Sequence, residues 1–262
     1  MSMQDFWGVV REVIEQSDVV IEVLDARMPT QTRNRKIEKD VKIARKPLVF
    51  AVNKSDLISL KEQKQYKKDL EKDGVCLFVS CRNRIGISFL KRKVFEIAEK
   101  RSHRWVNIGV IGYPNTGKSS LINALAGRKK AKVGSKPGFT RGVQWISAGP
   151  GIRLLDTPGV IPFSENNEIK QSLTGVLDPS KIKDPEDVAK KIIKMFSDEN
   201  KIPFEKFYKI KIGNKRFGGI INEIGMTRNM LKKGGIIDKR RVYVTIINDW
   251  QKGKLLLNYR CC

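Results

Sequence analysis

The segment that most constrains this chain is a glycine-containing loop at residues 112–119. It follows the pattern Gly-x-x-x-x-Gly-Lys-Ser and lies between an apolar run at 106–111 and a helix-like run at 120–125. Glycines let such a loop fold so that its backbone N–H groups face a phosphate chain, and the N-terminus of the following helix adds its dipole. A strand, this loop and a helix in that order predict an α/β fold with a phosphate-binding site.

Two side chains of this loop have defined chemical roles at a bound nucleotide. We expect Lys118 to reach the β- and γ-phosphates and the Ser119 hydroxyl to bind Mg²⁺. Four neighbouring residues complete the predicted contacts with the nucleotide: Asn115, Thr116, Gly117 and Ser120. Lys118 also belongs to the predicted catalytic set, because its charge would stabilise the transferring phosphoryl group.

A second candidate phosphate contact is the tetrapeptide Asp156-Thr157-Pro158-Gly159, directly after an apolar run. A carboxylate at a strand end can hold Mg²⁺ through water, and a glycine N–H can meet the γ-phosphate. Alone, such a tetrapeptide is typical of a turn. Downstream of the phosphate loop it predicts Asp156 as a metal ligand and Gly159 as a catalytic contact.

A base-recognition motif precedes both phosphate motifs. Residues 53–56 read Asn-Lys-Ser-Asp and follow the apolar run 47–52. The Asp56 carboxylate can accept hydrogen bonds from N1–H and the 2-amino group of guanine, whereas adenine has an acceptor at N1 and no 2-amino group. The motif therefore predicts binding of GTP or GDP rather than ATP.

Other residues near this motif have supporting roles. Lys54 could lie over the base or brace the phosphate loop, and Asn53 could tie loops together. Ser80 and Cys81 follow the apolar run 75–79, where a short loop could offer a backbone N–H to guanine O6.

The alternation of apolar runs with helix-like segments predicts a doubly wound α/β fold with a mostly parallel sheet. Gly149-Pro150-Gly151 joins the last two runs, which predicts a hairpin and one antiparallel strand. Helices are expected at 5–16, 59–72 and 87–100, the last with Phe89 on its apolar face. The six expected strands are 19–24, 47–52, 75–79, 106–111, 143–146 and 152–155.

The composition changes after about residue 163, where strand-like runs give way to helix-like segments. Residues 201–262 carry 15 Lys/Arg against 4 Asp/Glu, a net charge of +11. We therefore predict a nucleotide-binding domain at 1–163 and a small, mostly α-helical, basic domain at 164–262. Its helices are expected at 185–197, 216–231 and 238–252, the first of them capped by Asp184 with a proline in its first turn.

The charge of the whole chain points to a polyanionic partner. Its 52 Lys/Arg and 28 Asp/Glu give a net charge of +24, and phosphate contacts dominate nucleic-acid affinity. A heat-adapted surface is the alternative, but it predicts more acids beside the bases. Without an apolar run of about 18 residues or a signal peptide of the Sec type, we expect a cytosolic protein with no membrane contact.

The order of these motifs is unusual. GTPase motifs are numbered G1 (phosphate loop), G2 (switch I threonine), G3 (here 156–159), G4 (here 53–56) and G5 (here Ser80-Cys81). In this chain G4 and G5 come before the phosphate loop, so the order is G4-G5-G1-G2-G3. In this order the chain resembles the YlqF/RbgA (YawG/YlqF) family of circularly permuted GTPases. Asp25-Ala26-Arg27-Met28-Pro29 is similar to the DARxP element of that family, and Pro137-Gly138-Phe139-Thr140-Arg141 to its PGxTR element. The resemblance covers residues 1–163 well and the C-terminal part loosely.

This resemblance implies a P-loop GTPase that binds Mg²⁺, hydrolyses GTP slowly alone and acts in large ribosomal subunit assembly through rRNA contact. We expect a monomer. By the same resemblance Thr140 would be a Mg²⁺ ligand and catalytic residue, and Asn115 could hold K⁺. Val160 stands where a water-orienting glutamine often follows Gly159, so water activation of the Ras type is not expected.

Two other functions fit the same residues. The chain could be a regulatory GTPase of another RNA process, such as tRNA modification. It could also be a non-catalytic, nucleotide-gated RNA-binding module, since it lacks the glutamine.

Overall fold

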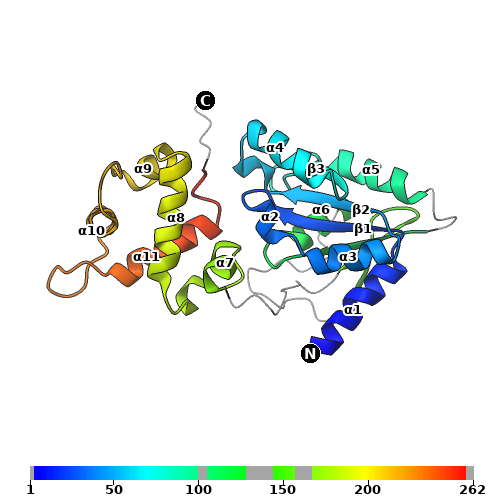
Figure 1. Cartoon of the computed structure of the whole chain (residues 1–262), viewed down its shortest axis with the longest axis horizontal. Helices are drawn as coiled ribbons and strands as arrows, with labels where there is room; N and C mark the ends of the chain where they lie inside the picture. The colour runs from blue at the N-terminus through cyan, green and yellow to red at the C-terminus, as the bar shows by residue number, and fades with distance from the viewer. Residues whose placement is uncertain (1–2, 100–104, 128–143, 157–166, 258–262) are drawn as a thin grey trace. The chain divides into compact units, whose positions relative to one another are not determined.

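The computed structural model describes residues 3–99, 105–127, 144–156 and 167–257. Their contacts divide the chain into two compact units, Met1–Glu165 and Asn166–Cys262 (Figure 1).

A six-stranded sheet with the order β3-β2-β1-β4-β6-β5 forms the centre of the first unit. Neighbouring strands are parallel except β5 and β6, which pair antiparallel. The predicted α/β class, the mostly parallel sheet and the hairpin are confirmed. The strands are β1 (Val19–Asp25), β2 (Leu48–Asn53), β3 (Val75–Phe78), β4 (Val106–Gly112), β5 (Gln144–Ser147) and β6 (Ile152–Asp156).

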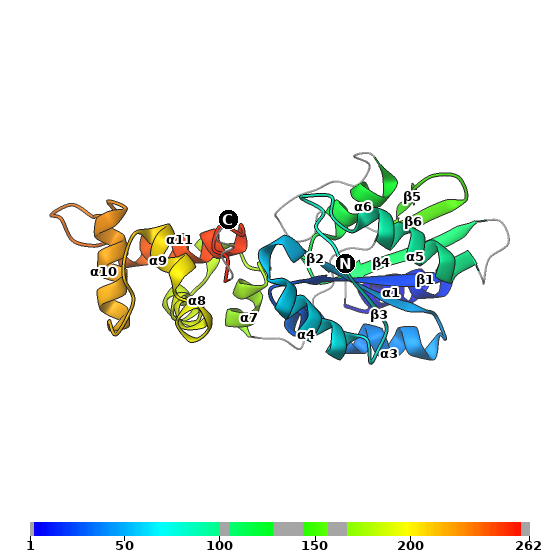
Figure 2. The same cartoon turned by 90° about the horizontal axis from the view of Figure 1, so that it is seen from above.

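Helices cover both faces of this sheet, as Figure 2 shows for α5 and α6 on one side and for α3 and α4 on the other. The strands supply both cores because successive side chains point to opposite faces. In β1, Ile21 packs with α5 and α6, whereas Val20 packs with α1 and α3. The helices are α1 (Met3–Gln16), α3 (Arg35–Ile43), α4 (Leu60–Leu70), α5 (Ile87–Glu99) and α6 (Lys118–Ala126).

Two helices of this unit were not expected from the sequence. α2 (Pro29–Thr32) is a single turn, and α3 buries only Ile37 and Val41 as apolar side chains. The start of α3 is nonetheless encoded locally, because the side chain of Asn34 accepts a hydrogen bond from the Ile37 N–H.

The apolar face expected for α5 was partly wrong. Leu90 and Val94 are buried, but Phe89 is 50% exposed. At helical spacing Phe89 lies about 100° from Leu90 around the helix, at the margin of the buried face.

The described residues of the second unit, 167–257, form helices joined by loops, with one isolated β-bridge between Leu231 and Ile237 and no strand. Phe196 of α8 meets Trp250 of α11 edge to face, with ring centroids 6.3 Å apart, and Phe204 of α9 packs 5.3 Å from Phe196. The Trp250 indole N–H donates to the carbonyl oxygen of Leu173 at 2.9 Å. The helices are α7 (Glu168–Leu173), α8 (Pro185–Glu199), α9 (Ile202–Tyr208), α10 (Phe217–Thr227) and α11 (Lys239–Gln251).

Three expectations for this unit need correction. α10 ends at Thr227 rather than 231, because Asn229 takes a left-handed backbone conformation with φ +50°. Asp184 precedes α8 and Pro185 opens it, but the Asp184 side chain makes no capping hydrogen bond. α7 and α9 were not expected.

No described helix is both long and apolar enough to cross a membrane.

Candidate nucleotide-binding site

The motif residues gather where three neighbouring parallel strands end. Asp25 ends β1 and lies in register with Asn53 at the end of β2, and Gly112 ends β4 in register with Val23. Ligands of open α/β sheets bind at this carboxyl edge. The permuted chain therefore brings its base-recognition motif and its phosphate loop to one edge of the sheet.

Close packing against neighbouring backbone and side chains accounts for two loop glycines. A Cβ on Gly112 would lie 2.6 Å from the carbonyl oxygen of Val23. Gly117 has φ +96°, and a Cβ there would overlap the amide nitrogen of Asn53. A side chain at either position would push the loop away from the strand ends.

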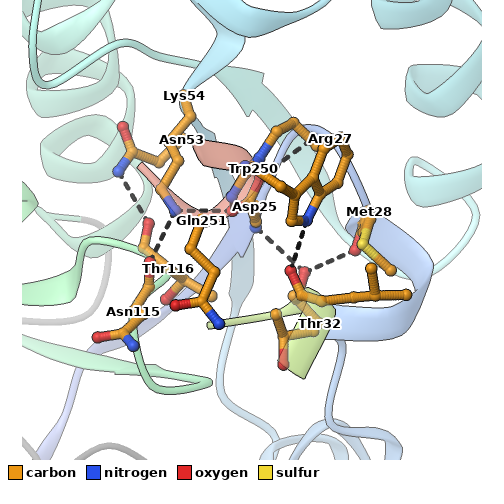
Figure 3. Close-up of polar contacts among 12 residues, drawn as sticks. Asp25, Arg27, Met28, Thr32, Asn53, Lys54, Asn115, Thr116, Trp250 and Gln251 are labelled. Carbon is orange, nitrogen blue, oxygen red and sulfur yellow. Dashed lines mark hydrogen bonds and ion pairs between the residues drawn. The ribbon is translucent and has the colours of Figure 1, made fainter. Parts of the chain in front are cut away.

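Asn53 joins three loops of the site, and Figure 3 shows it beside Thr116 of the phosphate loop. Its Nδ2 donates to the carbonyl oxygen of Thr116 at 2.9 Å, and its Oδ1 accepts from the backbone N–H of Cys81 at 3.1 Å. The side chain is buried, with 3% exposed. Asn53 therefore has the tying role that the sequence suggested for it.

Lys54 braces the phosphate loop. Its backbone is left-handed, with φ +64°. Its Nζ donates to the carbonyl oxygen of Asn115 at 2.8 Å and lies 2.7 Å from Oδ2 of Asp25 (Figure 3). The sequence allowed Lys54 either to lie over the base or to brace the phosphate loop, and this arrangement matches the bracing role.

Asp25 is the anchor of Lys54, a role that the sequence did not suggest. Arg27 also binds the Asp25 carboxylate through two side-chain nitrogens, at 3.0 and 2.7 Å. Burial alone would raise the pKa of Asp25, but Arg27 and then Lys54 outweigh it and hold that pKa well below its usual range. Burial lowers the pKa of Lys54, and Asp25 opposes part of that effect. The signal in the sequence was an acid at the end of the first buried strand.

Asp56 carries an unsatisfied acceptor. It lies in a 3₁₀ turn, Ser55–Leu57, directly after Lys54. Its Oδ1 is buried and has no hydrogen-bond partner among the residues that the structure describes. Buried carboxylate oxygens are normally paired, so this oxygen is suited to accept from a donor on a ligand.

The backbone amides of Ser80 and Cys81 already have partners. Ser80 N–H donates to the carbonyl oxygen of Ile85 at 3.0 Å, and Cys81 N–H donates to Asn53. A guanine O6 would have to share or replace one of these acceptors, so the predicted contact stays a prediction. Burial, with a smaller contribution from Asp56, raises the pKa of the Cys81 thiol to about 12.

The phosphate end of the site is the N-terminus of α6. Lys118 opens this helix with 8% of its surface exposed, and Ser119 and Ser120 follow in the first turn. Among the described residues no side chain caps the helix, so its first N–H groups, which have no intrahelical acceptors, suit an anion. The Thr116 hydroxyl donates to the carbonyl oxygen of Tyr113 at 2.8 Å, which stabilises the loop itself.

The predicted metal ligands are only partly described. Asp156 is the last residue of β6, in register with Val110 of β4, and Thr140 and Gly159 lie outside the described residues. Among the described residues, no group of three His, Cys, Asp or Glu side chains could hold a metal ion. A Mg²⁺ ion here would need nucleotide phosphate oxygens to complete its coordination.

The fold and the site together define a P-loop domain of the GTPase class whose motif order is permuted. A family model described as "50S ribosome-binding GTPase" matches residues 107–210. That match begins in β4, the strand before the phosphate loop, so the base-recognition motif lies upstream of it.

Relatives and solved structures agree with this class. An uncharacterized GTP-binding protein of Methanocaldococcus jannaschii is 34% identical over 94% of this chain and 65% of its own length. Nucleolar GTP-binding protein 2 of Saccharomyces cerevisiae is 33% identical over 95% of this chain and 52% of its own. GDP-bound TM YlqF superposes with a TM-score of 0.68 at 23% identity, with 94% of each chain covered. GNP-bound YlqF from T. maritima superposes with a TM-score of 0.63 at 23% identity, with 95% of this chain and 94% of that chain covered.

The chain shares the fold of these YlqF structures, and over nearly all of its length it is similar to GTP-binding proteins. The chain spans 65% of the length of the M. jannaschii relative and 52% of that of the S. cerevisiae relative. It spans 40% of the length of nucleolar GTP-binding protein 2 of Neurospora crassa.

Proposed function

We propose that this protein binds and hydrolyses GTP and acts as a nucleotide-switched factor in assembly of the large ribosomal subunit. The observation that carries the nucleotide assignment is the buried Oδ1 of Asp56 at the carboxyl edge of the sheet, which has no hydrogen-bond partner in the described part of the chain. Guanine presents two donors on one edge, N1–H and the 2-amino group, and so matches a carboxylate.

The phosphate chemistry follows from α6 and its preceding loop. Lys118 and the helix N-terminus would neutralise charge on the β- and γ-phosphates, and Ser119 would bind Mg²⁺ together with Asp156 and Thr140. Mg²⁺ would supply electrostatic stabilisation of the transferring phosphoryl group. In place of a glutamine at Val160, we propose that a K⁺ ion held by Asn115, or the ribosomal particle itself, completes the site.

The ribosomal assignment rests on relatives and on charge. The matching family model is described as a 50S ribosome-binding GTPase, and several relatives are named as nucleolar GTP-binding proteins. The second unit, Asn166–Cys262, contains the whole of the strongly basic stretch 201–262. We propose that this unit contacts rRNA, in a monomeric and cytosolic protein.

The permuted chain order suggests how nucleotide could control that contact. The Asp156–Gly159 motif precedes the second unit directly in the chain, and the second unit begins at Asn166. We propose that the γ-phosphate orders this connection and so sets the pose of the basic unit, an order–disorder switch.

The experiment is GTP hydrolysis by the full chain, alone and with large ribosomal subunits from the same source, in K⁺ or Na⁺ buffer. We expect slow turnover alone, and stimulation by particles and by K⁺. Lys118→Ala should abolish the stimulated rate, and Lys61→Ala, an exposed lysine on α4, should not change it. Guanine-nucleotide binding without turnover under any condition would favour a non-catalytic RNA-binding module. Stimulation by tRNA rather than by particles would favour another RNA process.

A further inference from the structure

Three exposed side chains form an array on the last strands of the sheet. Trp145 lies on β5, the edge strand, Arg153 lies on β6, and Trp105 directly precedes β4. Trp145 is 48% exposed and Trp105 is 38% exposed. The Arg153 guanidinium carbon is 4.2 Å from the ring centroid of Trp105 and 5.8 Å from that of Trp145. We call these three residues the Trp–Arg–Trp array.

Strand alternation explains why the array faces outward. Ile146 and Leu154 are buried in the core formed with α5 and α6. Their neighbours Trp145 and Arg153 therefore point to the opposite face of the sheet. The exposed fractions show that this face is left largely uncovered near its edge.

Both tryptophan rings remain more than a third exposed. An exposed position on an edge strand is ordinarily polar or charged, and half-exposed tryptophans gain only part of their burial energy. Arg153 has no carboxylate within ion-pair distance among the residues that the structure describes, whereas Arg92, which lies over exposed Phe89 on α5, pairs with Glu96. Exposed Trp and Arg side chains are typical of binding surfaces.

The charge of the surrounding sequence favours a nucleic acid as the partner. Residues 100–104, before Trp105, contain three Lys/Arg and one His, and residues 128–141, before Trp145, contain six Lys/Arg and no acid. Tryptophan rings stack on unpaired bases, and arginine adds a cation–π contribution and a phosphate contact.

We propose that the Trp–Arg–Trp array binds unpaired RNA bases by stacking. This surface belongs to the nucleotide-binding unit, so it adds an RNA contact to that proposed for the basic unit. The inference rests on the proposed function only for the ribosomal identity of the RNA, because stacking on the array needs no bound GTP.

The test is fluorescence anisotropy of the full chain with a labelled oligoadenylate of about twelve nucleotides, the length that a stacking groove typically covers. A hairpin duplex of equal charge is the comparison. Trp145→Ala, and more so Trp105→Ala with Trp145→Ala, should weaken binding of the single strand by about 5- to 150-fold per ring. Duplex binding should change little, and the quenching of tryptophan fluorescence by the single strand should fall.

Matched variants separate stacking from other effects. Phe89→Ala, at an equally exposed aromatic beside an arginine, should leave single-strand affinity unchanged, and Trp145→Phe should keep most of it. The salt dependence should be unaltered by Trp145→Ala and reduced by Arg153→Ala, because only the latter removes a phosphate contact.

Two results would overturn the inference. One is wild-type affinity for the single strand in the double alanine variant. The other is loss of binding to ribosomal particles with unchanged single-strand affinity, which would assign the array to a protein partner. GDP affinity, measured in parallel, should be unaffected by these variants. If the wild-type chain binds no GDP, the proposed function fails while the RNA result stands.

Discussion

Replacing Asp56 with alanine separates the base-recognition role of this residue from its contribution to stability. Oδ1 of Asp56 makes no hydrogen bond to the described part of the protein. Removal of the carboxylate should therefore change the free energy of unfolding by less than about 1 kcal/mol, since few protein contacts are lost.

The effect on nucleotide affinity should be much larger. A hydrogen bond to a charged group contributes about 1.5–3 kcal/mol, and guanine would donate two of them to Asp56. Loss of both corresponds to about 3–6 kcal/mol, or a decrease in GDP affinity of about 150- to 25,000-fold. ADP affinity should hardly change, so the GDP/ADP ratio should fall toward one.

The assay is a competition titration of a fluorescent GDP analogue with GDP and ADP, with thermal unfolding of each variant in parallel. Asp69→Ala, at an exposed acid on α4, is the control and should change neither quantity. A GDP affinity within about threefold of wild type, or an equal loss for ADP, would refute the base-recognition role.

The other predictions concern the loop contacts and a buried acid. Asn53→Ala leaves a buried amide and carbonyl unpaired and should cost about 2–4 kcal/mol of unfolding free energy in urea titrations; no loss would show that water replaces the side chain. Gly117→Ala should abolish GDP binding in the same titration, because its Cβ meets a side-chain amide, whereas Gly127→Ala, with open space around its Cβ, should keep it and cost about 1 kcal/mol of stability. Burial raises the pKa of Glu22 well above its usual range, and the neighbouring Glu38 raises it further. The protonated Glu22 carboxyl therefore contributes fully to the free energy of unfolding below about pH 4. That contribution is lost as the pH rises toward the folded-state pKa. Glu22→Gln should therefore become more stable relative to wild type between pH 5 and pH 8 in urea titrations; a constant difference in the free energy of unfolding would contradict the raised pKa of Glu22.

Predictions were most successful where the local pattern was strong. The apolar runs were long enough to specify the strands, and the phosphate loop and the Asn53–Asp56 motif each lie directly after one of them. The edge of the sheet at which they meet then followed from parallel strand order. The hairpin was predicted because Gly149 and Gly151, which have positive φ angles in the structure, mark a turn.

The predictions failed where structure depends on distant partners or on weak local signals. α3 has only two buried apolar side chains, so helical periodicity could not reveal it. The ion pair between Asp25 and Lys54 joins residues that adjoin only once β1 and β2 are in register. The hydrogen bond from the Cys81 backbone N–H to Asn53 likewise depends on the packing of two loops.

The most direct test of the account is co-sedimentation of the full chain with large ribosomal subunits from the same source. The chain would be loaded with a non-hydrolysable GTP analogue or with GDP, at moderate K⁺ and Mg²⁺. We expect binding with the GTP analogue and release with GDP, and loss of this difference in Asp56→Ala at limiting nucleotide. Equal binding, or no binding, in both nucleotide states would contradict it.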